Sequence, residues 1–208
     1  MTGLSNAEIK RTLDEYEIQV SDEVCNSIRV YISLLRRWNQ RVSLTTVTSP
    51  TETLRFHFGE SIFAARVAPI LRGRLADVGS GAGFPGLPLR LVRPEMDLTL
   101  IESNLKKAAF LSEVVRELQL DRVQVFRGRM NELSENDSGF DFITARAIGK
   151  YRDLLRWAGG RLAATGKIVL WLGDEGIDSV SGAADWKWQQ PRKIPLSKNR
   201  FILVGSRV

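Results

Sequence analysis

The chain has 208 residues, 43% hydrophobic and 26% charged, which is typical of one globular protein with a well-buried core. Its formal net charge is +6, and its apolar runs are far shorter than the ~20 residues of a membrane-spanning helix. A single cysteine, Cys25, excludes an internal disulfide, and a single histidine, His57, argues against a zinc site. With no secretory signal in the first residues, we expect a cytoplasmic monomer that binds neither a metal nor a membrane.

Residues 1–70 predict a helical extension. Capping-box patterns mark the start of a first helix at Ser5 and of a third helix at Ser49. Between them, apolar residues at helical spacing form one stripe over residues 24–42, which predicts a long second helix. The third helix is expected to continue to about Val67.

Residues 71–208 predict the α/β core on which this helical extension packs. Short apolar runs alternate with helix-like segments, the pattern of a mostly parallel, doubly wound sheet with helices on both faces. Two closing strands without a helix between them, 189–195 and 201–208, predict an antiparallel C-terminal edge. The other expected strands are 75–78, 97–101, 123–126, 140–144 and 167–172, and the expected helices or turns are 84–93, 105–118, 130–133 and 150–158.

The excess positive charge lies in the second part of the chain. Residues 1–70 carry eight basic and eight acidic side chains, whereas residues 71–208 carry 22 basic and 16 acidic ones. The excess is densest from residue 146 to residue 167 and after Asp185, beyond which no acidic residue follows. This pattern is typical of a phosphate-binding surface and also of a solvated face, so charge alone leaves nucleic-acid binding open.

The stretch LADVGSGAGFPGLPL, residues 75–89, contains a glycine loop directly after the first expected strand. Gly79, Gly81 and Gly83 let the backbone turn sharply and approach an anionic ligand, and ligands of such sheets bind at the carboxyl ends of the strands. The letters GAGFPG also satisfy the dinucleotide pattern G-x-G-x-x-G. Asp77 lies before the glycines, where a carboxylate favours a sulfonium ligand with an α-amino group over a pyrophosphate.

Glu102 ends the second expected strand, 23 residues beyond Gly79. A carboxylate at this position can accept hydrogen bonds from both ribose hydroxyls, which predicts an adenosine-containing cofactor. An acid favoured by a helix dipole is the alternative interpretation. An NAD(P)-dependent oxidoreductase stays an alternative function, although no histidine or Tyr-x-x-x-Lys pair for hydride chemistry occurs in the second part of the chain.

The loop residues 77–89, DVGSGAGFPGLPL, resemble the S-adenosylmethionine loop of the glucose-inhibited division protein B family, bacterial 16S ribosomal RNA guanine-N7 methyltransferases. The likeness extends to RWNQRVSLTTV (37–47), HFGES (57–61), GR (128–129) and ARA (145–147). The resemblance implies a Rossmann-like class I methyltransferase fold, S-adenosylmethionine as cofactor, and 16S rRNA or the small ribosomal subunit as partner.

The resemblance also implies roles for individual residues. Gly79 and Phe84 would line the methionine and adenosine parts of the cofactor, Glu102 would bind the ribose, and Met130 with Asn131 would border the adenine. The complete expected cofactor set is Asp77, Gly79, Gly81, Gly83, Phe84, Glu102, Met130, Asn131 and Arg146.

The sequence departs from the family pattern at four positions. Asn131 replaces an acid, and its amide oxygen can still accept a hydrogen bond from the adenine amine. Glu60 replaces an aspartate, and Ser43 replaces an asparagine. Leu172 replaces a lysine, so either substrate binding tolerates the loss of that lysine or Lys150 or Arg152 compensates for it. The departures at Leu172 and Asn131 leave a non-catalytic RNA-binding or ribosome-assembly protein as a third hypothesis.

The residue types fit guanine N7 as the methyl acceptor. Methylation of a pyrimidine at C5 needs a cysteine nucleophile, but Cys25 falls in the helical stripe and is expected to be a core residue. Methylation of an exocyclic amine commonly uses an Asn/Asp-Pro-Pro-aromatic turn after the fourth strand. This chain reads TARAIG there, with no proline and no aromatic residue. N7 carries a free lone pair and needs no general base. Arg146 is the predicted catalytic residue, donating to guanine O6 or to a phosphate, with an ion pair to Asp77 or Glu60 as the alternative. Further candidates for RNA contact are His57, Lys150, Arg152, Lys198 and Arg200.

Overall fold

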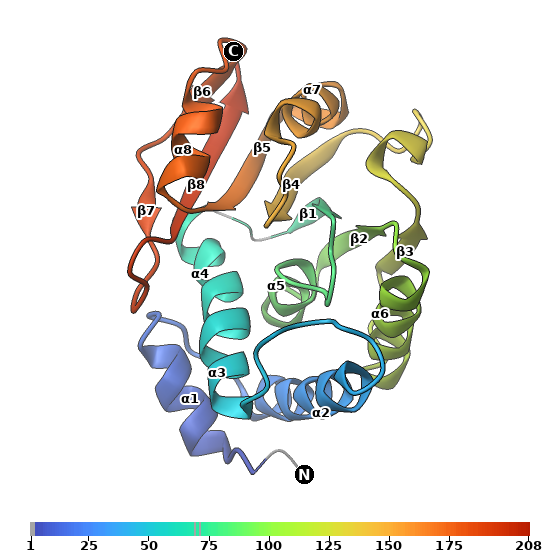
Figure 1. Cartoon of the computed structure of the whole chain (residues 1–208), viewed down its shortest axis with the longest axis vertical. Coiled ribbons are helices and arrows are strands. Elements are labelled where there is room, and N and C mark those ends of the chain that lie inside the picture. Colours follow the sequence, from blue (N-terminus) through green and yellow to red (C-terminus); the bar gives the residue numbers. More distant parts are fainter. Residues whose placement is uncertain (1–2, 69, 71) are drawn as a thin grey trace.

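A single sheet forms the centre of the computed structural model, which describes residues 3–68, 70 and 72–208. Within these residues the strand order is β3-β2-β1-β4-β5-β8-β6, and β7 also pairs with β8 (Figure 1). Strands β1 to β5 pair in parallel, whereas β8 is antiparallel to β5, β6 and β7. The strands are β1 (Gly73–Val78), β2 (Met96–Glu102), β3 (Val123–Arg127), β4 (Phe140–Arg146), β5 (Leu162–Leu172), β6 (Trp186–Trp188), β7 (Arg192–Lys193) and β8 (Phe201–Arg207).

Helices cover both faces of this sheet, which confirms the predicted doubly wound fold. Helices α5 (Gly86–Val92) and α6 (Leu105–Glu117) contact the strands from β1 to β3, and α7 (Tyr151–Arg161) and α8 (Asp174–Ser181) contact β5. The strand order reverses at β1 and β4, so the crevice at their carboxyl ends is the expected ligand site. Within the described part of the chain, every helix is too short or too polar to cross a lipid bilayer.

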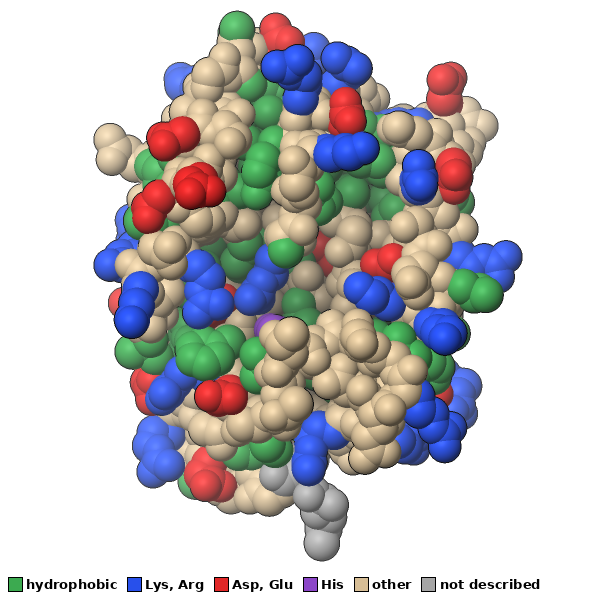
Figure 2. Space-filling model, viewed as in Figure 1, with side chains coloured by type: hydrophobic (Ala, Val, Ile, Leu, Met, Phe, Trp, Pro, Cys, Tyr) green, Lys and Arg blue, Asp and Glu red, His purple; other side chains and the backbone are tan. Residues whose placement is uncertain are grey.

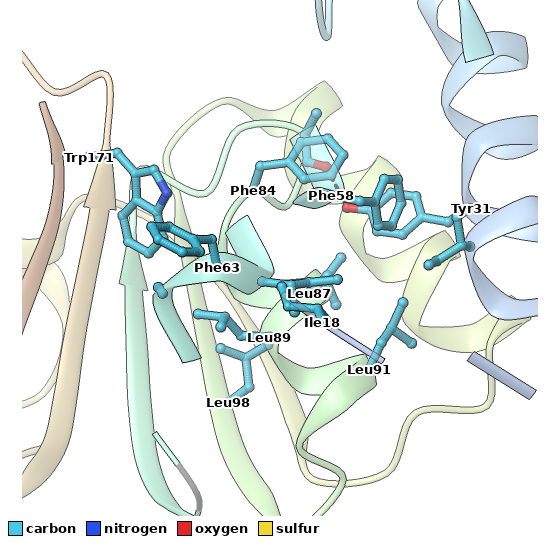
Figure 3. Close-up of a cluster of buried hydrophobic side chains, with 14 of the residues drawn as sticks. Ile18, Tyr31, Phe58, Phe63, Phe84, Leu87, Leu89, Leu91, Leu98 and Trp171 are labelled. Atoms are coloured by element: carbon cyan, nitrogen blue, oxygen red, sulfur yellow. Dashed lines mark hydrogen bonds between the residues drawn. The ribbon is translucent and has the colours of Figure 1, made fainter. Parts of the chain in front are cut away.

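Alternating strand residues enter two hydrophobic clusters, one on each face of the sheet. In β1, Leu75 belongs to the cluster beneath α5 and α6, whereas Ala76 belongs to the cluster beneath α7 and α8. The first cluster also contains Tyr31 and Phe58 from the N-terminal helices, which lie beside Phe84 of the glycine loop (Figure 3). The N-terminal helices therefore share one core with the sheet, and a division at residue 70 stays a prediction.

Local capping places the N-terminal helices where the sequence predicts them. The Ser5 hydroxyl accepts from the Glu8 N–H at 3.2 Å, the Glu8 carboxylate accepts from the Ser5 N–H, and Ser49 caps the third helix with Pro50 at its first position. Cys25 is buried in the second helix, as expected for a core residue. The helices are α1 (Asn6–Asp14), α2 (Asp22–Asn39), α3 (Pro50–Thr53) and α4 (Glu60–Val67).

A π-helical turn, η1 (Leu54–Gly59), lies between α3 and α4. The predicted third helix therefore has the expected extent, but its middle turn is wider than an α-helical one. Gly59 packs directly on the Tyr16 ring, where any Cβ would overlap with it, and the Tyr16 hydroxyl donates to the Arg55 carbonyl at 2.9 Å. Because these contacts come from the turn after the first helix, apolar spacing alone does not reveal the π-turn.

The C-terminal part differs from the prediction in two places. The strand expected over residues 189–195 is replaced by β6 and β7, and Pro191 between them has no N–H for a strand ladder. Helix α8 is absent from the prediction because Val180 is its one fully buried side chain and Gly176 interrupts its helical propensity. The short 3-10 turn η2 (Met130–Glu132) lies where a turn is expected.

Candidate cofactor and substrate site

The glycine loop between β1 and α5 has left-handed backbone at three successive glycines. Gly79, Gly81 and Gly83 have φ values of +69°, +58° and +88°, which side-chain-bearing residues rarely adopt. A Cβ at Gly83 would in addition overlap with the Tyr31 hydroxyl. The sequence prediction of a tight glycine turn at this edge of the sheet is therefore confirmed by the backbone.

Asp77 lies fully buried beneath this loop. Its Oδ1 accepts from the Thr144 hydroxyl at 2.8 Å, and its Oδ2 accepts from the Gly86 N–H at 3.2 Å. Burial raises the pKa of Asp77 to about 6, although both hydrogen bonds lower it. The carboxylate thus ties β4 and α5 to the loop from below, and its expected contact with a cofactor amino group stays a prediction.

A cavity of about 410 Å³ opens at the carboxyl ends of β1 to β4. Each strand end supplies part of its wall, as the position of ligands in open α/β sheets requires. Of the expected cofactor residues, Gly79, Met130 and Asn131 line it, and so does the RNA candidate Lys150. The remaining lining residues are Val78, Ile101, Ser103, Gly128, Arg129, Ile148, Gly149 and Asp153.

Glu102 lies at the end of β2, between the glycine loop and the start of α6, and is 7% exposed. Its Oε2 accepts from the Gly81 N–H at 2.8 Å, and its Oε1 accepts from the Asn104 N–H at 2.7 Å. Each carboxylate oxygen has a further lone pair, so ribose hydroxyls can still donate to it. Glu102 can therefore hold the glycine loop and still accept hydrogen bonds from a ribose, and its ribose contact stays a prediction.

An aromatic stack from the N-terminal helices holds the far side of the loop. Phe84 lies between Tyr31, at a ring-centroid distance of 5.5 Å, and His57, at 4.7 Å. The Tyr31 hydroxyl donates to the Ala82 carbonyl at 2.6 Å. Tyr31 lies within the range of the apolar stripe predicted for the second helix, but only the folded chain reveals that its hydroxyl supports the loop.

Arg146 ends β4, next to the strand end from which the glycine loop begins. Its Nη2 lies 3.1 Å from Glu60 Oε2 and donates to the Phe56 carbonyl at 3.1 Å. The other Glu60 oxygen, Oε1, lies 2.7 Å from Arg200 Nη2. The ion pair with Glu60, one of the two alternatives for Arg146, is therefore present, and its catalytic role stays a prediction.

The Arg146 guanidinium keeps an unused donor in this arrangement. Its Nη1 is buried and has no hydrogen-bond partner among the described residues. Burial lowers the pKa of Arg146, while Glu60 raises it. Arg146 lies at the ligand end of the sheet but does not line the cavity of about 410 Å³, so its contact with a substrate or cofactor oxygen stays a prediction.

His57 is neutral at physiological pH in this site. Burial and the nearby Arg146 lower the pKa of His57 to about 4. Its Nε2 lies 2.7 Å from the Thr45 hydroxyl, and its Nδ1 is buried without a partner among the described residues. Figure 2 shows the histidine within a hollow on this face, with Lys and Arg side chains beside it.

The other candidates for RNA contact lie outside the cavity of about 410 Å³. Lys198 is exposed in the loop before β8, and Arg152 lines a separate cavity between α7, α8 and β6. Leu172, the position where the family has a lysine, is buried in the core beneath α8. The site therefore brings Arg146, His57 and Arg200 together and leaves Arg152 and Lys198 at its periphery.

The cavity fits S-adenosylmethionine in its chemistry. Ile101, Met130 and Ile148 offer apolar walls for an adenine ring, and Glu102 at the edge of β2 has lone pairs for a ribose. The bare backbone of Gly79 faces the cavity, with the Ile148 side chain 3.4 Å from the place a Cβ would take. These residues would hold the adenosine part of the cofactor.

This strand order, with a glycine loop after β1 and an acid ending β2, defines a Rossmann-like class I methyltransferase. Residues 24–195 match the family described as rRNA small subunit methyltransferase G, and the chain belongs to this family. The family suspected from the sequence is thereby confirmed, and so is S-adenosylmethionine as the expected cofactor of this chain. The comparisons offer nothing in favour of an oxidoreductase.

Proteins named ribosomal RNA small subunit methyltransferase G are similar over most of their length. The protein of Klebsiella pneumoniae (strain 342) is 39% identical over 160 residues, which cover 76% of this chain and 75% of the relative. That of Syntrophotalea carbinolica is 33% identical over 207 residues, which cover 95% and 92%.

Solved structures support the fold alone. The ribosomal protein L11 methylase of Lactobacillus delbrueckii subsp. bulgaricus has a TM-score of 0.61 at 13% identity, covering 74% of this chain and 79% of that one. MtNAS in complex with MTA and tNA also has a TM-score of 0.61, at 16% identity, covering 89% and 75%.

Proposed function

We propose that this protein transfers the methyl group of S-adenosylmethionine to N7 of a guanine in 16S rRNA. Membership in the rRNA small subunit methyltransferase G family supports the reaction and the RNA. The observation that carries the choice of acceptor atom is the Arg146 guanidinium, held by Glu60 and with a buried, unpartnered Nη1. When bound, the cofactor supplies an electrophilic methyl group.

The side chains near the loop suit an acceptor that loses no proton on attack. A histidine whose pKa is about 4 is too weak a base to remove a proton from an exocyclic amine efficiently. Cys25 is buried in α2 and is no candidate nucleophile. Guanine N7 attacks with its own lone pair, so positioning and the exclusion of water supply most of the rate acceleration.

Arg146 would orient the base by donating to guanine O6. Donation to N7 itself would occupy the lone pair that attacks the methyl group, so O6 is the productive acceptor. His57, Lys150, Arg152, Lys198 and Arg200 remain the proposed RNA contacts. A cytoplasmic location and a monomeric state remain predictions that accompany this function.

Labelled S-adenosylmethionine tests the proposal directly. The protein is incubated with 16S rRNA or with small ribosomal subunits, and the modified nucleotide is mapped by borohydride and aniline cleavage. Label at a guanine whose backbone cleaves under this treatment supports N7. Label in a pyrimidine or in an exocyclic amine contradicts the proposed atom, and RNA binding without methyl transfer supports the non-catalytic alternative.

A further inference from the structure

Phe56 and Arg200 form a stacked pair beside the candidate substrate site. The Arg200 guanidinium carbon lies 5.3 Å from the centroid of the Phe56 ring. The Arg200 side chain is 41% exposed, and Phe56 is half-buried. The guanidinium therefore lies over the Phe56 ring, and both side chains are partly accessible to solvent.

Glu60 holds this pair in place from below. Its carboxylate is 1% exposed and contacts Arg200 through Oε1 and Arg146 through Oε2. The Phe56 carbonyl accepts from Arg146 Nη2, so the same residue contributes its backbone to one arginine and its ring to the other. Phe56 in the π-turn and Glu60 at the start of α4 thus contact two distant segments, the end of β4 and the loop before β8.

We infer that the Phe56–Arg200 pair is a stacking platform for the target guanine when it is unstacked from the rRNA, an inference that rests on the proposed function. Proteins that read single-stranded RNA stack splayed bases on aromatic rings and on arginine guanidinium planes. Glu60 compensates one of the two positive charges of Arg146 and Arg200. We therefore expect Arg200 to bind the base through the flat face of its guanidinium and not mainly through its charge. Glu60 links this platform to Arg146, the residue proposed to orient the guanine.

A pair of substitutions at Phe56 separates stacking from packing. Phe56→Leu keeps an apolar side chain of similar reach but removes the ring, and Phe56→Tyr restores a ring. We expect Phe56→Leu to raise KM for the RNA roughly 5- to 150-fold, the range of base–aromatic stacking, and Phe56→Tyr to rescue most of this loss. Thermal stabilisation by S-adenosylhomocysteine should be the same in both variants, because neither change touches the cofactor cavity.

Arg200→Lys provides the second arm of the test. Lysine keeps the positive charge near Glu60 but has no planar face, so KM for the RNA should rise as it does in Phe56→Leu. If Arg200→Lys binds RNA like the wild type while Arg200→Gln does not, Arg200 contacts a phosphate and the platform is wrong. The same conclusion follows if Phe56→Leu leaves KM unchanged.

The outcome also distinguishes this inference from the proposed function. If the wild-type protein methylates rRNA at N7 and the ring at Phe56 has no effect on KM, only the platform fails. If the wild type transfers no methyl group to rRNA, the proposed function fails. Filter-binding of the same RNA to wild type and Phe56→Leu then still decides whether the platform binds a base.

Discussion

Glu60 and Arg146 form an ion pair at 3.1 Å that joins the start of α4 to the end of β4, 86 positions apart in sequence. Burial raises the pKa of Glu60, and the two arginines lower it. Since Glu60 is almost completely buried, its charge can remain there only because Arg146 and Arg200 compensate it. The pair therefore couples the N-terminal helices to the ligand edge of the sheet.

Replacing Glu60 by glutamine should destabilise the protein and disturb the reaction together. The neutral amide leaves the partly buried Arg146 without its counter-charge, so the free energy of unfolding should fall by roughly 2–4 kcal/mol. Because Arg146 loses the group that orients it, kcat for rRNA methylation should fall at least about tenfold. Urea unfolding and single-turnover methyl transfer measure the two effects.

An exposed ion pair gives the matched control for this substitution. Glu17 lies 3.3 Å from Arg66 and both side chains are more than half exposed. Glu17→Gln should change stability by less than about 1 kcal/mol and leave methyl transfer unchanged. Equal effects of Glu60→Gln and Glu17→Gln would show that burial at Glu60 has no special role.

Tyr31 is expected to support cofactor binding from outside the sheet. Tyr31→Phe removes the hydroxyl that donates to the Ala82 carbonyl within the glycine loop, which should cost about 1–2 kcal/mol and loosen the loop. Affinity for S-adenosylhomocysteine, measured by calorimetry, should fall several-fold. Tyr16→Phe is the control, because its hydroxyl also donates to a backbone carbonyl, that of Arg55, but away from the loop. A similar loss of cofactor affinity in both variants would contradict the proposed support.

The order of elements could be predicted from the sequence because it depends on local patterns. The capping residues Ser5 and Ser49 and the alternation of apolar runs are properties of short segments, and each indicates its element directly. The π-turn depends on how Tyr16 packs against Gly59, and α8 buries Val180 alone, so neither leaves a periodic signal.

The candidate site was only partly predictable for a related reason. Gly79, Met130 and Asn131 follow strand ends directly, and the topology brings strand ends together, so their meeting in one cavity is foreseeable. The surroundings of Arg146 are set by Glu60, Phe56 and Arg200, which come from two distant segments. The sequence offers the ion pair with Glu60 as one alternative for Arg146, but it carries no signal for the contacts of Phe56 and Arg200.

Asp77 and His57 should have opposite effects on stability over the same pH range. Burial raises the pKa of Asp77 from 3.8 to about 6, so its contribution is fully present below pH 3.8 and is lost as pH rises through 6. Burial lowers the pKa of His57 from 6.5 to about 4, so its contribution is fully present above pH 6.5 and is lost as pH falls through 4. Each amounts to the order of 3 kcal/mol, so the two largely offset each other in the wild type.

Single substitutions should separate these two effects. In His57→Gln the Asp77 contribution remains, so stability relative to the wild type should fall as pH rises from 4 to 6. In Asp77→Asn the His57 contribution remains, and relative stability should rise over the same range. Urea unfolding at pH 4.5, 5.5 and 6.5 measures the differences, and parallel curves for the two variants would contradict the assigned pKa directions.

The cavity along α7, separate from the cofactor cavity, is predicted to bind the rRNA backbone away from the methylation site. It measures about 700 Å³, and Arg152, Arg156 and Arg207 line it together with one acid, Asp185. Among the described residues neither Arg152 nor Arg156 has an acidic partner within 4.0 Å, whereas the exposed acids of α8 lie outside the lining. Figure 2 shows Lys and Arg side chains over the region of α7.

Gly160, in the same lining, allows a charge to be added without disturbing the fold. A Cβ there meets no atom within 4 Å, so both Gly160→Glu and Gly160→Gln should fold, and they differ only in one negative charge. Gly160→Glu should weaken RNA binding and reduce the slope of log K against log salt by about one, while Gly160→Gln should keep the wild-type slope. Filter binding between 50 and 200 mM salt measures the slopes. Identical slopes for the two variants would place the RNA backbone elsewhere, because a carboxylate beside bound phosphates cannot leave their counterion release unchanged.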